Sequence, residues 1–362
     1  MKISIYSHGH EKKIQKLVPV LEPFFSNNNK KYNYPWQKEA VYKPLWDVAH
    51  NYFKTSALEQ ADIVVIPVDW YWVRGYSWNT RENKELRKYL TEFNEEVLSS
   101  GKPVVGFFSG DRSCEKTPLK NTTLFRESAY KSRLMKNSDL PLPAFIEDFL
   151  FYYADDDLCL RKKSAKPVVG FCGLASFMDY KNYLKLGVFQ ARSLFFQQLW
   201  DVSPYKGERL RSHMLSVLEL DENINSNFII RDKNTFIGIV DNQDKFKLRQ
   251  EYVGNITNSD YVLCCRGSGN FSYRLYETLC MGRIPVVIDT DIKLPFDDLI
   301  NWKEHVVWVE EKDINCIGQI VAEFHENLSD EDFETIQKEN RKLWLEWLSP
   351  KGFYSNFYRF FE

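Results

Sequence analysis

The sequence predicts an α/β protein of two Rossmann-like domains, each built on a parallel sheet. Short apolar runs rich in β-branched residues alternate with longer segments whose apolar residues recur at helical spacing. Helical crossovers of this kind join strands that run parallel. The 362 residues, 44% of them hydrophobic, supply enough material for two cores. The predicted strands are 3–6, 63–68, 104–108, 167–171, 228–230, 236–240, 261–265, 284–288 and 305–309.

A change of composition between residues 154 and 166 predicts the boundary between the domains. Three aspartates are followed there by the basic run RKKSAK, and a new apolar strand begins immediately afterwards. We therefore expect a first domain over residues 1–160 and a second domain from residue 161. The predicted helices are 80–100, 186–200, 208–220, 246–257, 271–281, 313–327 and 329–348.

Charge and cysteine content limit the classes of function. The net charge is −2 with both signs mixed along the chain, which argues against a nucleic-acid or membrane-surface partner. The seven cysteines include no C-x-x-C pair, so we expect small core residues in a reducing compartment. The chain opens into a predicted strand and has no apolar run of about 18 residues. These features favour a cytoplasmic protein without a membrane-spanning segment.

A strand, a glycine-rich turn, a helix and a second strand follow one another within residues 261–288. Glycines let the backbone approach a ligand, and the start of a helix offers unpaired N–H groups and the positive end of the helix dipole. The pattern is neither a Walker loop nor the dinucleotide-binding G-x-G-x-x-G. The residues of the turn that we expect to bind a ligand are Arg266, Gly267, Ser268, Gly269 and Asn270.

Two arginines and a glutamate supply charged side chains in and after this turn. An anion at the turn would meet Arg266 at the strand end and Arg274 one turn into the helix. Glu277 shares a helix face with Arg274 and lies roughly 7–8 Å beyond Ser272 along the axis, at about 1.5 Å per residue. A nucleotide sugar, with phosphates at one end and hydroxyls at the other, fits that length. The alternative is a solvated ion pair on an ordinary helix.

Polar side chains follow the first three predicted strands of the first domain. These are His8, Asp69 and Asp111. Ligands of doubly wound sheets bind at the carboxyl ends of the strands, so the three side chains are expected at the ligand-binding edge, although His8 also fits an ordinary polar loop. The aromatic and charged segment 30–50 is either an acceptor groove, because sugars pack on aromatic rings, or a lid over the core.

The segment 255–302 carries a longer set of motifs. It has a serine at a helix end, Arg-Gly at a strand end, Ser-x-Arg-x-x-Glu, Gly-x-x-Pro-Val, and Leu-Pro-Phe before a tryptophan. In these positions the chain resembles the nucleotide-sugar half of the exostosin-type glycosyltransferases. The positions are Ser259, Arg266, Gly267, Ser272, Arg274, Glu277, Gly282, Pro285, Val286, Leu294, Pro295, Phe296 and Trp302.

Weaker similarities and two departures accompany this resemblance. Residues 59–67 resemble the family's N-terminal half, and Phe171-Cys172-Gly173 with Arg192 resembles its phenylalanine-x-glycine and arginine elements. Cys265 replaces a common proline, which changes little. Asp111 stands where a histidine–aspartate pair is usual, which leaves the identity of the catalytic base open.

The resemblance implies the GT-B architecture, in which two Rossmann-like domains with parallel sheets face a central cleft. Residues 1–160 would form the acceptor side and residues 161–335 the nucleotide-sugar side. A terminal helix within 336–362 would pack back on the first domain. The implied reaction transfers a sugar from a nucleotide sugar, UDP-linked, to a glycan acceptor, with inversion and without a metal cofactor.

The resemblance also implies roles for single residues. Glu277 would bind the ribose hydroxyls. Arg266, Arg274 and the backbone of residues 267–272 would hold the pyrophosphate, with Gly173 and Arg192 as further donor-site residues. Inversion needs one base from the facing domain, and we rank Asp111 first, ahead of Asp69 and His8.

Three other interpretations stay open at this point. Asp289-Thr290-Asp291 is a D-x-D motif, which metal-dependent glycosyltransferases use to hold a divalent cation, although Arg266 and Arg274 make a cation unnecessary. The same scaffold would also suit a carbohydrate-binding protein without catalysis. A phosphorylase or epimerase is disfavoured because no lysine for a Schiff base is indicated.

Overall fold

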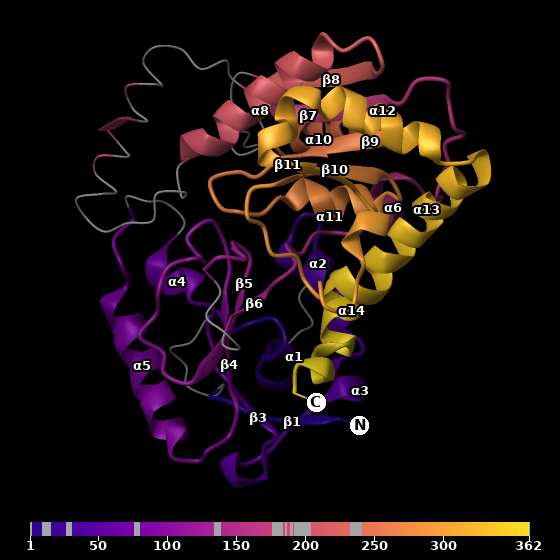
Figure 1. Ribbon diagram of the computed structural model, residues 1–362. Helices are drawn as coiled ribbons and strands as arrows, with labels where there is room; N and C mark the ends of the chain where they lie inside the picture. The colour runs from indigo at the N-terminus through magenta and orange to yellow at the C-terminus, as the bar shows by residue number, and fades with distance from the viewer. Residues whose placement is uncertain are drawn as a thin grey trace.

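The computed structural model confirms an α/β fold with two parallel sheets. It describes residues 2–8, 16–26, 31–75, 80–133, 139–175, 204–231 and 241–361, with the single positions 184, 187, 188 and 191. Figure 1 shows one sheet above the other, the first half of the chain below and the second half above. The domain boundaries at residues 160 and 335 stay predictions.

Six strands form the first sheet, in the order β2-β1-β3-β4-β5-β6, and all neighbours pair in parallel. The sequence does not predict β2, β5 and β6, because each is short or carries polar residues that hide its apolar pattern. The strands are β1 (Ile3–Tyr6), β2 (Phe53–Thr55), β3 (Ile63–Val65), β4 (Val104–Phe108), β5 (Thr122–Arg126) and β6 (Asp139–Pro141).

Five parallel strands form the second sheet, in the order β11-β10-β9-β7-β8. Its central strands are apolar and buried, as expected for a parallel sheet covered by helices on both faces. The strands are β7 (Val168–Leu174), β8 (Asn225–Arg231), β9 (Tyr261–Cys264), β10 (Ile284–Asp289) and β11 (Val307–Glu310). The strand predicted at 236–240 lies outside the described residues, as does most of the helix predicted at 186–200.

Helices connect the strands in both halves of the chain. In the first half they are α1 (Glu22–Phe25), α2 (Lys38–Trp46), α3 (Ala49–Tyr52), α4 (Tyr71–Arg74), α5 (Lys84–Leu98) and α6 (Phe149–Tyr153), with a 3₁₀ turn at Leu58–Gln60. In the second half they are α8 (Pro204–Glu219), α10 (Asn242–Thr257), α11 (Tyr273–Cys280), α12 (Ile317–Asn327), α13 (Asp330–Leu343) and α14 (Pro350–Ser355). Short helical turns occupy Trp302–Glu304, Glu311–Cys316, Trp344–Leu348 and Phe357–Phe360.

The unit predicted at 261–288 is present as β9, α11 and β10. The predicted helix start at Phe271 is wrong by two residues, because Ser272 takes the extended backbone of an N-cap and α11 begins at Tyr273. Gly282 adopts φ 61°, the left-handed conformation that ends helices. β9 and β10 pair in parallel as expected.

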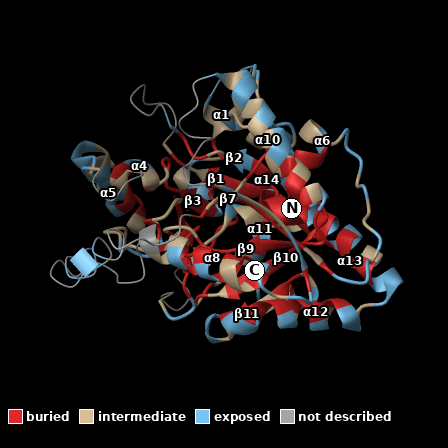
Figure 2. Ribbon diagram, turned by 90° about the horizontal axis from the view of Figure 1, so that it is seen from above, coloured by how far each residue is buried: buried red, intermediate tan, exposed pale blue. Residues whose placement is uncertain are grey.

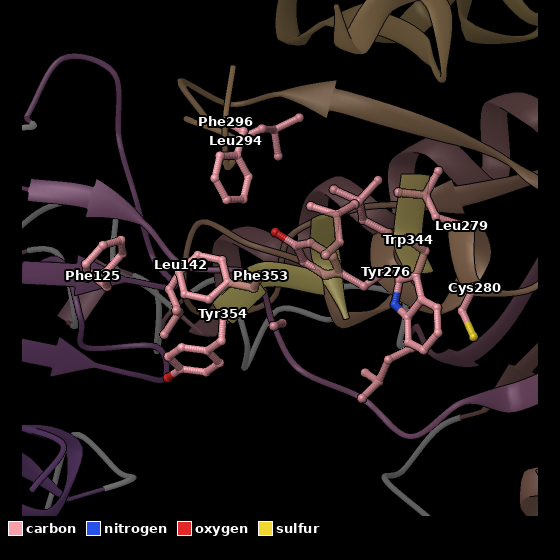
Figure 3. Packing of buried hydrophobic residues seen from close by; sticks show 14 of the residues in the cluster. Phe125, Leu142, Tyr276, Leu279, Cys280, Leu294, Phe296, Trp344, Phe353 and Tyr354 are labelled. Carbon is pink, nitrogen blue, oxygen red and sulfur yellow. The ribbon is translucent and has the colours of Figure 1, made fainter. Parts of the chain in front are cut away.

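The C-terminal segment crosses from the second domain to the first. In Figure 1, α13 runs down from the upper half to α14, which ends beside the first sheet. Phe353 and Phe357 pack on Phe125 of β5, with ring centroids 5.6 and 5.2 Å away. Figure 3 shows this aromatic core reaching from Phe125 to Tyr276 of α11. One hydrophobic core therefore joins the two domains.

The buried residues are distributed along the two sheets. Figure 2 shows buried residues along the strands of both sheets and exposed residues on the outer faces of the helices. No helix among the described residues is long and apolar enough to cross a membrane.

Candidate active site

A cavity of about 680 Å³ opens between the two domains and is lined by residues from both. We call it the cleft cavity. Its walls come from the carboxyl ends of β4 and β7, from α10 and α11, and from the segment between β6 and α6. The sequence-predicted site residues that line it are Asp111, Gly173, Gly267, Ser272, Arg274 and Glu277.

Arg274 lies flat on the end of β7. Its guanidinium carbon is 4.4 Å from the ring centroid of Phe171, and its Nη2 donates to the carbonyl oxygen of Cys172 at 2.8 Å. The next residue must be small, because a Cβ at Gly173 would lie 2.9 Å from that Nη2. Gly173, with φ 153°, thus lets the guanidinium reach the strand. In this structure Gly173 positions Arg274 as well as lining the cavity.

Glu277 sits behind Arg274 on the same face of α11 and is 6% exposed. Its carboxylate accepts a hydrogen bond from the Tyr252 hydroxyl, and the Arg249 guanidinium lies 3.4 Å away. Burial raises the pKa of Glu277, while Arg249, Tyr252 and Arg274 oppose the shift. Arg249 also pairs with Glu147 of the first domain at 2.7 Å. Glu277 therefore belongs to a buried charge network that crosses the cleft.

The glycine-rich turn is held by the first domain. Arg266 is 3% exposed, and its Nη2 donates to the Tyr130 hydroxyl and the Ser268 carbonyl oxygen, each at 3.0 Å. Gly267 lines the cleft cavity, and a Cβ there would meet nothing within 4 Å. Arg266 itself is not among the lining residues, so it supports the turn from behind.

Asn270 ends the turn in full burial. Its Nδ2 donates to the carbonyl oxygens of Ala129 and Thr290, and its Oδ1 accepts from the Thr290 hydroxyl at 2.6 Å. Its backbone N–H donates to the Ser128 hydroxyl at 2.8 Å. The side chain is thus used in joining the two domains, and a contact with a donor stays a prediction.

Asp111 faces the turn from the first domain. The Gly269 N–H donates to its Oδ1 at 3.0 Å. Burial raises the pKa of Asp111, and the Gly269 hydrogen bond and the Arg266 charge only partly oppose this. A carboxylate with a raised pKa is a stronger base once it is ionised. Asp111 is the one predicted base that lines the cleft cavity.

The other two predicted bases lie away from the lining residues. Asp69 accepts hydrogen bonds from the N–H groups of Tyr71 and Ser109, at 2.8 and 3.0 Å, and from the Ser109 hydroxyl. It thereby fixes the loop before Asp111. The His8 ring packs 4.5 Å from the Phe93 ring, with its nitrogens 3.3 Å from two tyrosine hydroxyls. Neither residue is brought next to the predicted donor site.

Sequence reasoning missed Glu127, which follows β5 on the same sheet edge. Its Oε2 accepts a hydrogen bond from the Gly110 N–H at 2.5 Å. Burial raises the pKa of Glu127 to about 8, and the nearby charges of Asp69 and Asp111 add to the shift. Its surroundings depend on the order β3-β4-β5, which no local motif reveals.

Arg211 of α8 is the second residue that sequence reasoning missed. Its Nη1 donates to the Leu174 carbonyl oxygen at 2.5 Å and its Nη2 to the Arg266 carbonyl oxygen at 3.3 Å. Burial and the charge of Arg274 lower its pKa. Both arginines line the cleft cavity, and neither forms an ion pair with a carboxylate within the described part of the chain. Together they make one wall of the cavity positive.

The remaining predicted residues have simpler positions. Ser272 is the N-cap residue of α11 but its hydroxyl makes no capping hydrogen bond. The Ser268 carbonyl oxygen accepts from Arg266, as described above. Arg192 lies outside the described residues.

The D-x-D motif contacts the first domain. The Asp289 carboxylate pairs with Lys131 at 2.7 Å, and the Asp291 carboxylate accepts from the hydroxyl and N–H of Ser132. Among the residues that the structure describes, no three His, Cys, Asp or Glu side chains gather as a metal site would require. Binding a cation at the motif would require these contacts to be replaced.

Comparison with known families then identifies the second half of the chain. Residues 188–324 match the model of the exostosin GT47 domain. The chain carries an exostosin GT47 domain. The motif from Arg266 to Glu277 and helix α8 with Arg211 lie inside the matched residues. Asp111, Asp69 and Glu127 lie outside them.

Curated proteins match the chain over a short stretch. A probable glucuronosyltransferase of Oryza sativa subsp. japonica is 44% identical over 71 residues, which are 20% of this chain and 17% of that protein. A probable beta-1,4-xylosyltransferase of Arabidopsis thaliana is 39% identical over 71 residues, 20% of this chain and 17% of that protein. The match thus spans less than a fifth of either relative.

Solved glycosyltransferase structures are similar to the chain over most of its length, but only weakly. TarM of S. aureus has a TM-score of 0.35 at 12% identity, covering 86% of this chain and 52% of that chain. WaaG, a glycosyltransferase of lipopolysaccharide biosynthesis, has a TM-score of 0.32 at 10% identity, covering 84% of this chain and 86% of that chain.

Proposed function

We propose that this protein is a cytoplasmic glycosyltransferase that moves a sugar from a UDP-linked donor to a glycan acceptor, with inversion and without a metal ion. One observation carries the proposal. The cleft cavity is lined at once by Arg274 and Glu277 of the exostosin GT47 domain and by Asp111 of the facing domain. A donor and an acceptor bound there would meet between a positive wall and a carboxylate.

The donor diphosphate would bind at Arg211 and Arg274. Their guanidiniums are fixed by hydrogen bonds to the carbonyl oxygens of Leu174, Arg266 and Cys172. The charge of Glu277 acts on Arg274 and that of Glu208 on Arg211, but neither carboxylate forms an ion pair with its arginine among the described residues. Burial and, after it, the charge of Arg274 lower the pKa of Arg211, so an anion bound beside the two arginines would favour the charged form of Arg211. Arg211 therefore joins Arg274 as the diphosphate clamp.

The turn and the glutamate would complete the donor site. Gly267 leaves open space on the cavity side, where a phosphate oxygen can approach the backbone. Glu277 would accept hydrogen bonds from the ribose hydroxyls, replacing or sharing the Tyr252 hydroxyl that it binds here. Burial disfavours the negative charge of Glu277, and the positive charges of Arg249 and Arg274 partly offset this cost.

This arrangement suits the chemistry of sugar transfer. The acceptor oxygen bonds to the anomeric carbon while the bond from that carbon to the diphosphate oxygen breaks, and the electron pair leaves with UDP. Fixed guanidiniums aimed at the growing charge supply several kcal/mol of transition-state stabilisation. Asp111 takes the proton of the attacking hydroxyl, a role that its buried carboxylate and cavity position support.

The position of the D-x-D motif supports a reaction without a metal. Its two carboxylates contact Lys131 and Ser132, whereas Arg211 and Arg274 can neutralise the diphosphate. In metal-dependent glycosyltransferases a divalent cation supplies the positive charge at the diphosphate, whereas here the two arginine side chains would supply it.

The test is release of UDP from UDP-glucuronic acid and UDP-xylose, measured in EDTA with and without a glycan acceptor. We expect release by the wild type and a loss of about a hundredfold in Arg274→Ala, the size seen when one transition-state donor is removed. Glu277→Ala, which removes a ligand of the ribose, should mainly raise KM for the nucleotide sugar. Glu326→Ala, on the exposed face of α12, is the matched control and should behave as the wild type. Binding of a glycan without any UDP release would favour the carbohydrate-binding alternative.

A further inference from the structure

A second cavity, of about 800 Å³, lies where the C-terminal segment returns to the first domain. It is walled by α2, by α6 and by the chain from Trp344 to Ser355, and we call it the tail cavity. Figure 1 shows α14 next to α2, and the two helices are in contact. None of the residues to which we assigned catalysis or donor binding lines this cavity.

Aromatic side chains form one wall of the tail cavity. Phe151 is 60% exposed, although its ring is large and apolar. The Tyr152 ring stands edge-on to it at 4.9 Å and edge-on to Tyr32 at 6.3 Å. The Tyr152 hydroxyl donates to the Tyr32 hydroxyl at 3.0 Å, which fixes both rings. Fixed aromatic rings beside hydroxyl groups are the surfaces on which sugar rings pack.

Charged groups of both signs also line the cavity, among apolar residues that include Ala40, Val41, Pro44, Trp344 and Leu345. The charged groups are Lys43, Asp47, Asp148, Glu346 and Lys351. Lys43 pairs with Asp47 at 2.7 Å, and Asp148 pairs with Arg341 at 2.8 Å. With Arg341 included, three cations stand against three carboxylates, so a polyanion finds no net attraction, and a lipid chain would have to desolvate these charges. A neutral chain rich in hydroxyl groups can pack its sugar rings on the aromatic side chains and form hydrogen bonds with the charged groups.

The tail cavity adjoins the cleft cavity. Val41 of α2 and Ile146, which precedes α6, line both cavities. Trp36, at the start of the same segment as α2, lines the cleft cavity and stacks on Tyr34 at 5.0 Å. The two cavities therefore lie on either side of Val41 and Ile146, and an acceptor chain that extends past these side chains would meet the aromatic wall.

We propose that the tail cavity binds a neutral segment of the acceptor glycan, several sugar units from the reacting hydroxyl. The inference rests on the proposed transferase function and specifies its acceptor as an oligosaccharide rather than a single sugar. The described part of the aromatic segment 30–50, from residue 31 on, would then lie between the reacting end and the distant end of the acceptor. Tyr152 is then a specificity-determining residue that takes no part in bond cleavage.

Binding of xylohexaose and cellohexaose, measured by titration calorimetry, tests the proposal directly. At least one of these neutral hexasaccharides should bind the wild type. Tyr152→Ala should weaken that binding about five- to tenfold, and Tyr152→Phe, which keeps the ring, should retain it. Tyr358→Ala removes an exposed tyrosine of the C-terminal turn that lines neither cavity and should leave affinity unchanged. Absence of binding, or equal affinity in Tyr152→Ala and the wild type, would overturn the proposal.

A second titration separates this inference from the donor assignment. UDP should bind the wild type and Tyr152→Ala equally, because Tyr152 does not line the cleft cavity. Failure of UDP to bind a protein that still binds the hexasaccharide through Tyr152 would contradict the donor site alone. If transfer is observed, Tyr152→Ala should raise KM for a hexasaccharide acceptor and leave kcat and the KM for a disaccharide unchanged. A purely structural role of Tyr152 would instead lower kcat and raise both KM values together.

Discussion

The carboxylate of Asp111 accepts a hydrogen bond from the backbone N–H of Gly269 across the cleft, with 3.0 Å between Oδ1 and N. The contact joins the predicted base of one domain to the predicted phosphate turn of the other. A Cβ at Gly269 would lie 2.8 Å from the Cα of Asp111 and 2.7 Å from a ring carbon of Phe271. Only glycine lets the two backbones approach this closely.

We expect Gly269→Ala to lower transfer activity at least tenfold and to lower the free energy of unfolding by about 2 kcal/mol, because overpacking pushes Asp111 from its place. Gly267→Ala is the matched control for the fold, since its Cβ would meet nothing within 4 Å. That control should unfold like the wild type but bind UDP more weakly. Urea unfolding and UDP release measure both effects, and full activity in Gly269→Ala would contradict the geometry.

Because Glu127 is buried, we expect the free energy of unfolding to depend on pH. Its pKa rises from the ordinary 4.5 to about 8 because it is buried near Asp69 and Asp111. Between these two values the folded protein holds a proton that the unfolded chain releases. Stability contributed by this group therefore falls as pH rises from 4.5 to 8, by at most about 1.4 kcal/mol per pH unit.

Glu127→Gln should remove that dependence, since glutamine is neutral throughout. Comparing urea unfolding of the two proteins at pH 5 and pH 8, we expect the variant to gain relative to the wild type at the higher pH. Glu326→Gln, at an exposed position, should show no such gain. Parallel pH curves for wild type and Glu127→Gln would refute the assignment of a proton to Glu127.

We expect substitution of Asn270 to lower the free energy of unfolding by a large amount. Its side chain makes three hydrogen bonds in full burial, two of them to Thr290 and one to Ala129. Asn270→Ala would leave buried partners unsatisfied and should cost about 3 kcal/mol of unfolding free energy. Asn258→Ala removes a single exposed hydrogen bond to Gly254 and should cost under about 1 kcal/mol. Thermal or urea unfolding distinguishes the two, and similar costs would count against the interdomain role of Asn270.

The D-x-D motif predicts metal independence. Asp289 pairs with Lys131, so Asp289→Asn weakens a domain contact without removing a diphosphate ligand. We expect UDP release to change less than fivefold in this variant and to be the same in EDTA and in added Mg²⁺ or Mn²⁺. Restoration of lost activity by a divalent cation would instead assign the motif to a metal.

The sequence predicts the α/β class, the unit from β9 to β10 and the turn between them, because apolar runs and glycines mark these features locally. It also places Asp111 at the cleft, since carboxyl ends of parallel strands share one edge. The resemblance named the exostosin-type family that the comparisons confirm. The predicted helix start at Phe271 is wrong because Phe271 fits the helical spacing of Leu275 and Leu279, although the N-cap residue Ser272 follows it.

Other features need the tertiary structure. Arg211 reaches the turn only because α8 packs beside it, with Gly207 so close that a Cβ there would lie 2.4 Å from the Gly267 carbonyl oxygen. Arg249 meets Glu147 across 102 positions of sequence. Such contacts depend on how distant segments pack, and neither residue belongs to a local motif. The roles of the individual site residues and the domain boundaries stay predictions.

The cleft cavity is expected to bind a nucleoside diphosphate through Arg274. Titration of UDP into the protein in EDTA tests this expectation most directly. We expect saturable binding by the wild type, at least about tenfold weaker binding by Arg274→Ala, and unchanged binding by Arg359→Ala, which removes an arginine that does not line the cavity. No binding by the wild type, or equal affinity in Arg274→Ala, would contradict it.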